Sequence, residues 1–259
     1  MTNALKEKLL RREKPLGTFC GLNSPTAMEC LGRTGLDFVI IDCEHSPAEV
    51  ETAAELIRAA ELSGLTPLCR VRDLSRSAVL KLLDVGARGL IVPNIHTVEE
   101  VRQLIDYAKF APVGQRGFCP TRKDGWGFDE NLTVAEAMAR MNEVTLLLPQ
   151  CETAGALEHI EEIVALEGVD GVFIGPFDLS IALGLPGQFD HPTMQNAFRR
   201  IREAAHKAGK LCFCFTGTAQ GAADGFAAGY DAMLMGIDTL LLINGVKSQV
   251  EAARKAAEM

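Results

Sequence analysis

Eight short apolar runs recur along this 259-residue chain, with segments of helical periodicity between them. A strand that is buried on both faces of a parallel sheet reads as a nearly continuous apolar run, whereas a helix repeats its apolar residues every three to four positions. The alternation of these two patterns predicts strand-helix units and a parallel sheet covered by helices. The runs are Leu16 to Gly21, Phe38 to Asp42, Pro67 to Val71, Gly89 to Pro93, Thr145 to Gln150, Gly171 to Gly175, Leu211 to Phe215 and Ala232 to Gly236.

The number of runs and the length of the chain favour a closed barrel over an open sheet. An eight-fold α/β barrel typically needs roughly 250 residues, which matches this chain. Helical patterns such as Val50 to Leu62, Val98 to Phe110 and Met194 to Ala208 lie between the runs. No GxGxxG fingerprint or P-loop follows the first run, which argues against an open nucleotide-binding sheet. We therefore predict a (β/α)8 TIM barrel, formed as a single domain by residues 1–259.

Composition excludes several classes of function. The net charge is −8 with acidic and basic residues interspersed, so the chain lacks the clustered basic face of a nucleic-acid-binding protein. No run approaches the roughly 18 apolar residues of a membrane span, and the charged first 14 residues lack a signal peptide's apolar core. The eight cysteines show no paired metal-binding spacing, which favours reduced, buried thiols. These features predict a cytoplasmic protein without nucleic-acid or membrane partners.

Two acidic residues follow consecutive strand-like runs. Glu152 comes just after the run that ends at Gln150, and Asp178 comes just after the run that ends at Gly175. Parallel strands end at the same rim, so both carboxylates are expected there, without histidine or cysteine at equivalent positions. Oxygen ligands of this kind favour Mg²⁺ or Mn²⁺, completed by water and substrate. The alternative is helix capping, for which glutamate is poorly suited and Thr153 a better candidate; for Asp178 alone, capping competes with metal binding.

Three further residues are candidates for chemistry at this rim. His45 follows the second run, three residues beyond Asp42, where an imidazole can act as a general base. Arg70 lies near the end of the third run, where a guanidinium suits a substrate carboxylate or an oxyanion, or else pairs with a rim acid. Asp84 lies near the apolar face of a helical pattern. It is a candidate for orienting an imidazole, although an exposed helix-end carboxylate is the simpler interpretation.

One long irregular stretch, Ala111 to Thr133, separates the fourth and fifth strand-like runs. Long loops inside compact domains are usually functional or disordered. The stretch is therefore predicted to cover the substrate, with a plain surface excursion as the alternative.

The lysines discriminate between two routes to a carbanion. A Schiff-base aldolase needs a lysine that projects into the barrel from a strand. Lys14 and Lys210 precede strand-like runs, and the other lysines lie in helices, loops or the N-terminal segment. The sequence instead favours metal-assisted proton abstraction beside a carbonyl, in which the cation binds a 2-oxo acid and stabilises the enolate.

Several motifs together resemble the HpcH/HpaI-type class II pyruvate aldolases, which include 4-hydroxy-2-oxoheptanedioate and 2-dehydro-3-deoxyglucarate aldolases. The resemblance extends over nearly the whole chain, and no single motif is specific alone. The motifs are GTF from Gly17, IIDCEHSP from Ile40, LDVGARGLIVP from Leu83, QRG from Gln115, PQCET from Pro149 and GVDGVFIGPFDLSIALG from Gly168.

The resemblance implies roles for particular residues. Glu152 and Asp178 would bind the metal, His45 paired with Asp84 would drive proton transfer, and Arg70 would hold the oxo acid. Gln150, Pro176 and Phe177 match substrate-binding positions. Members are usually hexamers built from dimers that exchange their C-terminal helices, which here would be Thr239 to Ala257.

The predicted activity is reversible cleavage of a 4-hydroxy-2-oxo acid into pyruvate and an aldehyde by a metal-dependent lyase. Related branches condense oxaloacetate with acetyl-CoA, decarboxylate oxaloacetate or cleave acyl-CoA thioesters, and these remain alternatives, as does a non-catalytic binding barrel. Cys119 and the charges of the segment Arg116 to Phe128 depart from the pattern of the resembled aldolases. This departure leaves the acceptor open.

Overall fold

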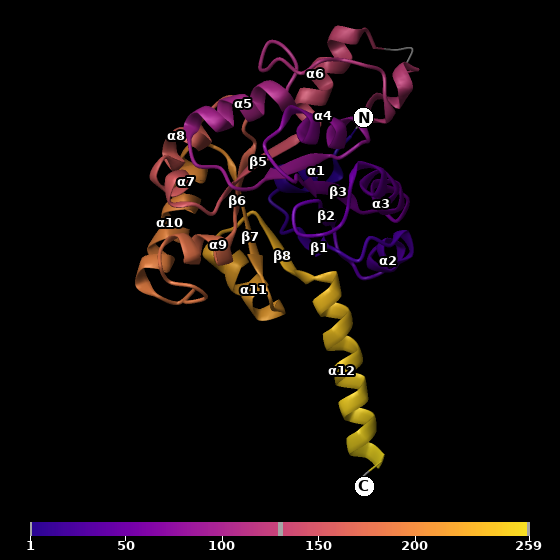
Figure 1. Ribbon diagram of the computed structural model, residues 1–259, viewed down its shortest axis with the longest axis vertical. Helices are drawn as coiled ribbons and strands as arrows, with labels where there is room; N and C mark the ends of the chain where they lie inside the picture. The colour runs from indigo at the N-terminus through magenta and orange to yellow at the C-terminus, as the bar shows by residue number, and fades with distance from the viewer. Residues whose placement is uncertain (1, 129–131, 258–259) are drawn as a thin grey trace.

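Eight parallel strands close into a barrel in the order β1 to β8 (Figure 1), which confirms the predicted (β/α)8 fold. The computed structural model describes residues 2–128 and 132–257. Every strand begins and ends within one residue of its predicted range. The strands are β1 (Leu16–Cys20), β2 (Phe38–Asp42), β3 (Thr66–Arg70), β4 (Gly89–Val92), β5 (Leu146–Cys151), β6 (Gly171–Ile174), β7 (Leu211–Thr216) and β8 (Ala232–Ile237).

Helices follow the strands and cover the barrel. Serine or threonine caps many of their N-termini; for example, the hydroxyl of Thr97 accepts a hydrogen bond from the backbone N–H of Glu100, three residues on. That the domain extends over all of residues 1–259 stays a prediction. The helices are α1 (Ala4–Leu10), α2 (Pro25–Leu31), α3 (Val50–Leu62), α4 (Arg76–Asp84), α5 (Val98–Ala108), the 3₁₀ helix η1 (Arg122–Gly127), α6 (Val134–Val144), α7 (Ala154–Glu158), α8 (Ile160–Ala165), α9 (Pro176–Ala182), α10 (Pro192–Lys207), α11 (Ala219–Ala228) and α12 (Asp238–Ala257).

The side chains alternate between two cores along each strand. Those pointing inward, such as Phe38, Ile40 and Leu68, fill the barrel, while their neighbours pack beneath the helices. Leu5 and Leu9 of α1 join the inner core. The side chain of Asn3 donates to carbonyls that precede β4 and β5, so α1 closes the amino end of the barrel. Space for a ligand therefore remains at the carboxyl end.

The segment from Ala111 to Thr133 lies at the amino end of the barrel, contrary to the prediction that it covers the substrate. Helix α5 begins after β4 and returns the chain to that end before the segment starts. There Arg116 contacts Asp84 at the end of α4 (2.7 Å), and Arg122 contacts Glu61 at the end of α3 (2.5 Å). Within one chain the segment is a surface excursion, and its residues 129–131 lie outside the described part.

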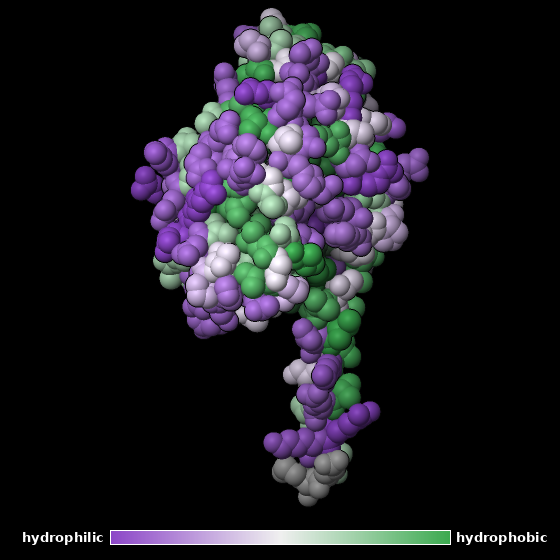
Figure 2. Space-filling view, turned by 60° about the vertical axis from the view of Figure 1, so that its left-hand side comes forward, coloured by the Kyte–Doolittle hydropathy of each residue, from purple (hydrophilic) through white to green (hydrophobic). Residues whose placement is uncertain are grey.

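Helix α12 projects away from the barrel (Figure 1). The carboxylate of Asp238 fixes its start, because it accepts hydrogen bonds from the backbone of Gly21 and Leu22 after β1. Apolar residues gather along one side of the projecting part and polar residues along the other (Figure 2). The exposed apolar residues are Leu240, Leu241, Leu242, Ile243, Val246 and Val250.

None of the helices in the described residues is long and apolar enough to span a membrane. The cellular compartment stays a prediction. All eight cysteines are free thiols, and six of them are buried, as the sequence predicts.

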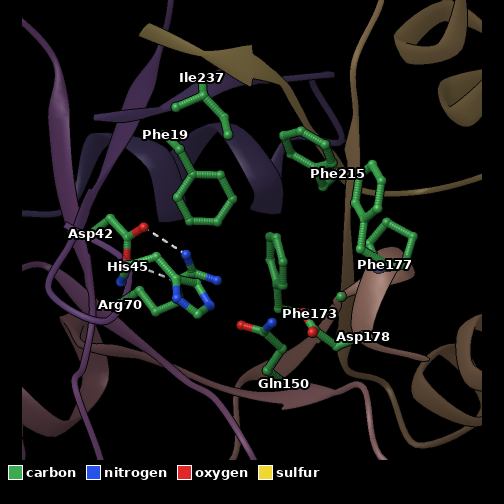
Figure 3. Close-up of a pocket in the computed structure, with 12 residues that line it drawn as sticks. Phe19, Asp42, His45, Arg70, Gln150, Phe173, Phe177, Asp178, Phe215 and Ile237 are labelled. Carbon is green, nitrogen blue, oxygen red and sulfur yellow. Dashed lines mark hydrogen bonds and ion pairs between the residues drawn. The ribbon is translucent and has the colours of Figure 1, made fainter. Parts of the chain in front are cut away.

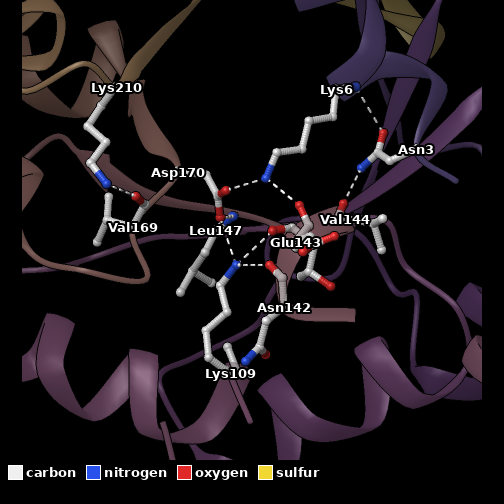
Figure 4. A network of polar contacts seen from close by, with 12 residues as sticks. Asn3, Lys6, Lys109, Asn142, Glu143, Val144, Leu147, Val169, Asp170 and Lys210 are labelled. Atoms are coloured by element: carbon white, nitrogen blue, oxygen red, sulfur yellow. Dashed lines mark hydrogen bonds and ion pairs between the residues drawn. The ribbon is translucent and has the colours of Figure 1, made fainter. Parts of the chain in front are cut away.

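The half-buried carboxylate of Asp170 contacts several elements at the amino end (Figure 4). Asp170, just before β6, accepts hydrogen bonds from Lys6 of α1 (2.6 Å), from Lys109 after α5 (2.8 Å) and from the backbone of Leu147 (3.0 Å). Lys109 is 3% exposed. Burial lowers the pKa of Lys109 and the charge of Asp170 opposes this effect. The buried ammonium therefore depends on Asp170.

Replacing Asp170 should destabilise the fold strongly. We expect Asp170→Ala to lower the free energy of unfolding by about 3–5 kcal/mol, because it leaves the Lys109 ammonium buried without its ionic partner. Urea denaturation followed by circular dichroism measures the change. The exposed Asp190→Ala serves as the control and should shift stability by less than about 0.5 kcal/mol. Equal effects of the two substitutions would contradict this role of Asp170.

Candidate active site

A cavity of about 210 Å³ opens at the carboxyl end of the barrel (Figure 3). Its walls come from strand ends and from the first turn of α9. Asp42, Arg70 and Gln150 continue the inward-facing side of β2, β3 and β5, which is why they meet at one rim. Its other lining residues are Phe19, His45, Phe173, Gly175, Pro176, Phe177, Asp178, Phe215 and Ile237.

Carboxylates of β2 and of the loop after it hold Arg70 in the cavity. Asp42 and Arg70 are paired residues of β2 and β3, and the guanidinium Nε and Nη2 donate to Asp42 at 2.9 and 2.6 Å. Glu44 lies 3.3 Å from Nη1. Burial alone would raise the pKa of Asp42, but the hydrogen bonds and charge of Arg70 outweigh it, so this pKa lies below its usual value. Arg70 therefore forms the ion pair with a rim carboxylate that the sequence predicted as its alternative role.

Glu152 has the environment of a ligand rather than of a helix cap. Thr153 caps α7 by accepting from Ala156 (3.0 Å). The Glu152 carboxylate is buried and accepts hydrogen bonds from the backbone N–H of Asn94 (2.6 Å) and from the side chain of Gln150. The pKa of Glu152 is raised to about 7, chiefly by burial and also by the nearby charges of Asp178 and Glu44, while the hydrogen bonds from Asn94 and Gln150 oppose the shift. The charge of Glu152 in turn helps to raise the pKa of Arg70.

Asp178 is exposed in the first turn of α9, and the N-cap of that helix, Gly175, offers no side chain. A Cβ atom at Gly175 would lie 2.6 Å from both the Glu152 Oε2 and the Gln150 Nε2 atoms. Only glycine leaves this space free. The Gln150 Oε1 atom, which also faces the cavity, is buried without a hydrogen-bond partner.

These residues fit a divalent cation that two carboxylates hold from one side. In residues 2–128 and 132–257, no group of three His, Cys, Asp or Glu side chains could enclose a metal by itself. Glu152 and Asp178 would therefore leave positions for water or substrate oxygens, which Mg²⁺ and Mn²⁺ commonly retain. None of the side chains that line the cavity is a lysine, in keeping with the predicted absence of a Schiff-base lysine.

The two remaining predicted residues, His45 and Asp84, lie at opposite ends of the barrel. His45 lies at the cavity, as expected from its position after β2; it is exposed, with its Nε2 atom 3.7 Å from Glu44. Asp84 lies at the amino end, where it contacts Arg116 and Lys123, so the His45–Asp84 pair does not form within one chain. The reason is that α4 carries Asp84 back toward the amino ends of the strands. Arg72 lies beyond β3 and is exposed.

Sequence reasoning missed several site residues. The backbone N–H of Asn94 reaches Glu152 because Asn94 adopts a left-handed conformation (φ 55°), a region that asparagine tolerates better than most residues. Four phenylalanines and an isoleucine also line the cavity, and each resembles ordinary barrel core in the sequence. They are Phe19, Phe173, Phe177, Phe215 and Ile237, and among these only Phe177 was predicted to contact substrate.

Comparison with known proteins identifies the family. The family model for HpcH/HpaI aldolase/citrate lyase matches residues 16–245. The 2-keto-3-deoxy-L-rhamnonate aldolase of Escherichia coli (strain K12 / DH10B) is 33% identical over 247 residues, covering 93% of this chain and 89% of that protein. Among solved structures, an HpcH/HpaI aldolase/citrate lyase family protein from Burkholderia cenocepacia J2315 has a TM-score of 0.90 and 30% identity, covering 98% of this chain and all of that one. The citrate synthase SbnG has a TM-score of 0.89 and 27% identity, covering 99% of each chain.

The chain belongs to the HpcH/HpaI aldolase/citrate lyase family. It is an enzyme of the class II aldolase kind, a lyase class that generally uses a divalent metal.

The buried pair of Asp42 and Arg70 should make stability depend on pH. Because the pKa of Asp42 is lowered on folding, its ionised form stabilises the protein above the unfolded-state pKa of about 3.9, and this stabilisation is lost as the pH falls through the folded-state pKa. Asp42→Asn should therefore cost on the order of 3 kcal/mol at pH 7. Urea denaturation of both proteins should show the difference narrowing below about pH 4. A difference independent of pH would contradict the ionised pair.

Proposed function

We propose that the protein reversibly cleaves a 4-hydroxy-2-oxo acid into pyruvate and an aldehyde through an enolate, with Mg²⁺ or Mn²⁺ as its cofactor. One observation carries the proposal: Asp178 and the guanidinium of Arg70 line one cavity, and the carboxylate of Glu152 lies directly behind its wall, hydrogen-bonded to Gln150 and within reach of the charge of Asp178. A divalent cation at the carboxylates would polarise the keto oxygen of the oxo acid. No residue on the cavity wall offers an amine for the competing imine route.

The residues at the cavity would have distinct roles in the reaction. Arg70 has guanidinium hydrogens beyond those bonded to Asp42 and would bind the substrate carboxylate and balance the oxyanion. Gln150 has an unpartnered Oε1 atom directed at the cavity, and Pro176 and Phe177 would contact the oxo acid. His45 would carry the transferred proton, with Glu44 as the acidic neighbour that the chain itself supplies.

Metal removal tests the proposal directly. The protein treated with a chelator should stop exchanging the methyl protons of pyruvate for deuterium, as followed by NMR, because the enolate loses its stabilising charge. Mg²⁺ or Mn²⁺ should restore the exchange, and the more effective ion identifies the better cofactor. Exchange that survives thorough metal removal would overturn the proposal.

Gly175→Ala provides a matched variant for the metal experiment. The added methyl group would occupy the space beside Glu152 and should weaken Mn²⁺ binding by about tenfold or more, measured by calorimetry. Gly217→Ala, at a glycine with open space around its Cβ position, is the control and should bind Mn²⁺ normally.

Loss of Arg70 should affect turnover more than binding of the metal. We expect Arg70→Ala to lower kcat for pyruvate exchange by about 100-fold or more, because the removed group stabilises developing negative charge. The exposed Arg72→Ala, which removes the same charge two residues later, should keep near-normal kcat. Equal kcat values for Arg70→Ala and the unaltered protein would remove Arg70 from the mechanism.

A second candidate is condensation of oxaloacetate with acetyl-CoA. The similarity to the citrate synthase SbnG over 99% of both chains supports it. The two candidates differ in their co-substrate, so release of free CoA from acetyl-CoA in the presence of oxaloacetate would favour the synthase. Decarboxylation of oxaloacetate and cleavage of acyl-CoA thioesters can be assayed with the same samples.

We also propose that α12 packs on a second copy of the chain, within a hexamer built from dimers that exchange this helix. Its apolar side chains have no cover within the described residues of one chain; Leu242, for example, is 56% exposed. Leu242, Val246 and Val250 are four residues apart, so they share one stripe of the helix. A stripe of this kind is stable in water only when another surface buries it.

Charges placed on that stripe should break the assembly. Val246→Glu combined with Val250→Glu should lower the molar mass measured by light scattering from that of an oligomer to that of the monomer, because buried glutamates would oppose docking. Lys247→Glu, on the neighbouring polar side, should leave the molar mass unchanged. A monomeric unaltered protein would contradict the exchange.

A further inference from the structure

The cavity has two chemically different sides. Figure 3 shows Asp42, His45 and Arg70 on one side and Phe177 and Phe215 on the opposite side. We call the apolar residues Phe19, Phe173, Phe177, Phe215 and Ile237 the aromatic wall. All of them line the cavity, and none carries a charge or a hydrogen-bonding side chain.

Contacts between its rings make the aromatic wall continuous from the barrel core to the rim. The rings of Phe19 and Phe173 lie 5.9 Å apart edge to face, Phe19 and Phe215 lie 5.9 Å apart, and Phe215 and Phe177 lie 6.2 Å apart. Phe173 is 1% exposed, whereas Phe177 is 55% exposed. Phe189, before α10, packs edge to face on Phe177 at 4.9 Å and holds that exposed ring in place. Water-exposed apolar surface of this kind favours an apolar ligand.

A second, larger cavity adjoins the aromatic wall. It has a volume of about 640 Å³ and shares Pro176, Phe177 and Phe215 with the first cavity. Apolar side chains that also line it include Phe198 and Met233, and its charged lining residues are Arg199, Arg202 and Asp224. The apolar part of this cavity next to Phe177 and Phe215 gives further space to a substituent too large for the first cavity.

The charges of the site disfavour an additional carboxylate on the acceptor. Arg70 is the one arginine that lines the first cavity, and Asp42 and Glu44 already bind it. The pKa of Glu44 is raised, chiefly by burial and further by neighbouring carboxylates including Asp178, while Arg70 opposes the shift. Within the first cavity an acceptor carboxylate would meet either these like charges or the uncharged aromatic wall, because Arg199 and Arg202 line only the second cavity. Desolvating a carboxylate without a partner is costly.

We propose that the aldehyde partner of pyruvate carries a branched-alkyl or aromatic substituent, which binds along the aromatic wall with Phe177 and Phe215 as specificity-determining residues. This inference rests on the proposed function. In the synthetic direction pyruvate loses one C3 proton, C3 bonds to the aldehyde carbon, and the carbonyl electron pair moves to oxygen, which takes one proton. The step needs no oxidant or reductant, and cleavage is its reverse.

Two aldehydes of matched shape test the inference. Succinic semialdehyde and 4-methylpentanal differ in replacing a planar carboxylate by an isopropyl group, at the same distance from the aldehyde carbon. With the metal-loaded protein and pyruvate, we expect kcat/KM for 4-methylpentanal to exceed that for succinic semialdehyde by about tenfold or more. Phe177→Arg, which puts a cation on the exposed end of the aromatic wall, should reduce this ratio by about tenfold or invert it. Ile181→Arg, also exposed on α9 but outside the cavity, should leave the ratio within about twofold.

Pyruvate deuterium exchange in the absence of any aldehyde separates this inference from the proposed function. Exchange together with equal or better use of succinic semialdehyde would overturn the apolar acceptor and leave the aldolase proposal standing. A ratio that Phe177→Arg does not change would overturn the assignment to the aromatic wall. If the metal-loaded, unaltered protein does not exchange the methyl protons of pyruvate, both the aldolase proposal and the apolar acceptor would be overturned.

Discussion

Closure of eight parallel strands is the constraint on which the rest of the structure depends. Pairing of β1 with β8 removes the sheet edges and leaves each strand one inward-facing row of side chains. Because all strands run in the same direction, the last inward residue of each row lies at the same rim. Asp42, Arg70 and Gln150 therefore converge although they are far apart in the sequence. Helix α1 closes the opposite end, so these polar side chains face the open end of the barrel.

The fold could be predicted closely from the sequence, because each strand is marked by a short apolar run of neighbouring residues. A buried strand needs a short apolar run, and each of the eight runs located a strand to within one residue. Asp178, His45 and Arg70 could be assigned to the cavity, and Glu152 to its immediate surroundings, for the same reason, since each follows or ends a run. The ion pair of Asp42 with Arg70 could not be predicted from the runs alone, because it depends on the register between β2 and β3.

The site predictions that failed depended on the path of the chain between strands or on a backbone conformation. The segment from Ala111 was assigned to the substrate rim from its position after the fourth run, but α5 had already returned the chain to the other end. Helix α4 likewise returns the chain to the amino end, so Asp84, its last residue, lies far from His45. The hydrogen bond from Asn94 depends on a positive φ angle that no residue pattern specifies uniquely. The aromatic wall could not be predicted, because its phenylalanines have the same sequence pattern as residues of the barrel core. Only the closed barrel shows which of them reach the cavity.

The balance of charge at the rim connects these observations to chemistry. Asp42 and Glu44 pair with Arg70, whereas Glu152 accepts hydrogen bonds from a backbone N–H and an amide and has Asp178 as a nearby like charge. Arg70 also interacts with Glu152 through its charge. Two carboxylates close together are unfavourable unless a positive charge joins them. Gly175 keeps the adjoining space free of a side chain, so the arrangement sacrifices packing to preserve a position beside Glu152. A barrel selected only for stability would fill that space, which supports the proposed cation site beside Glu152.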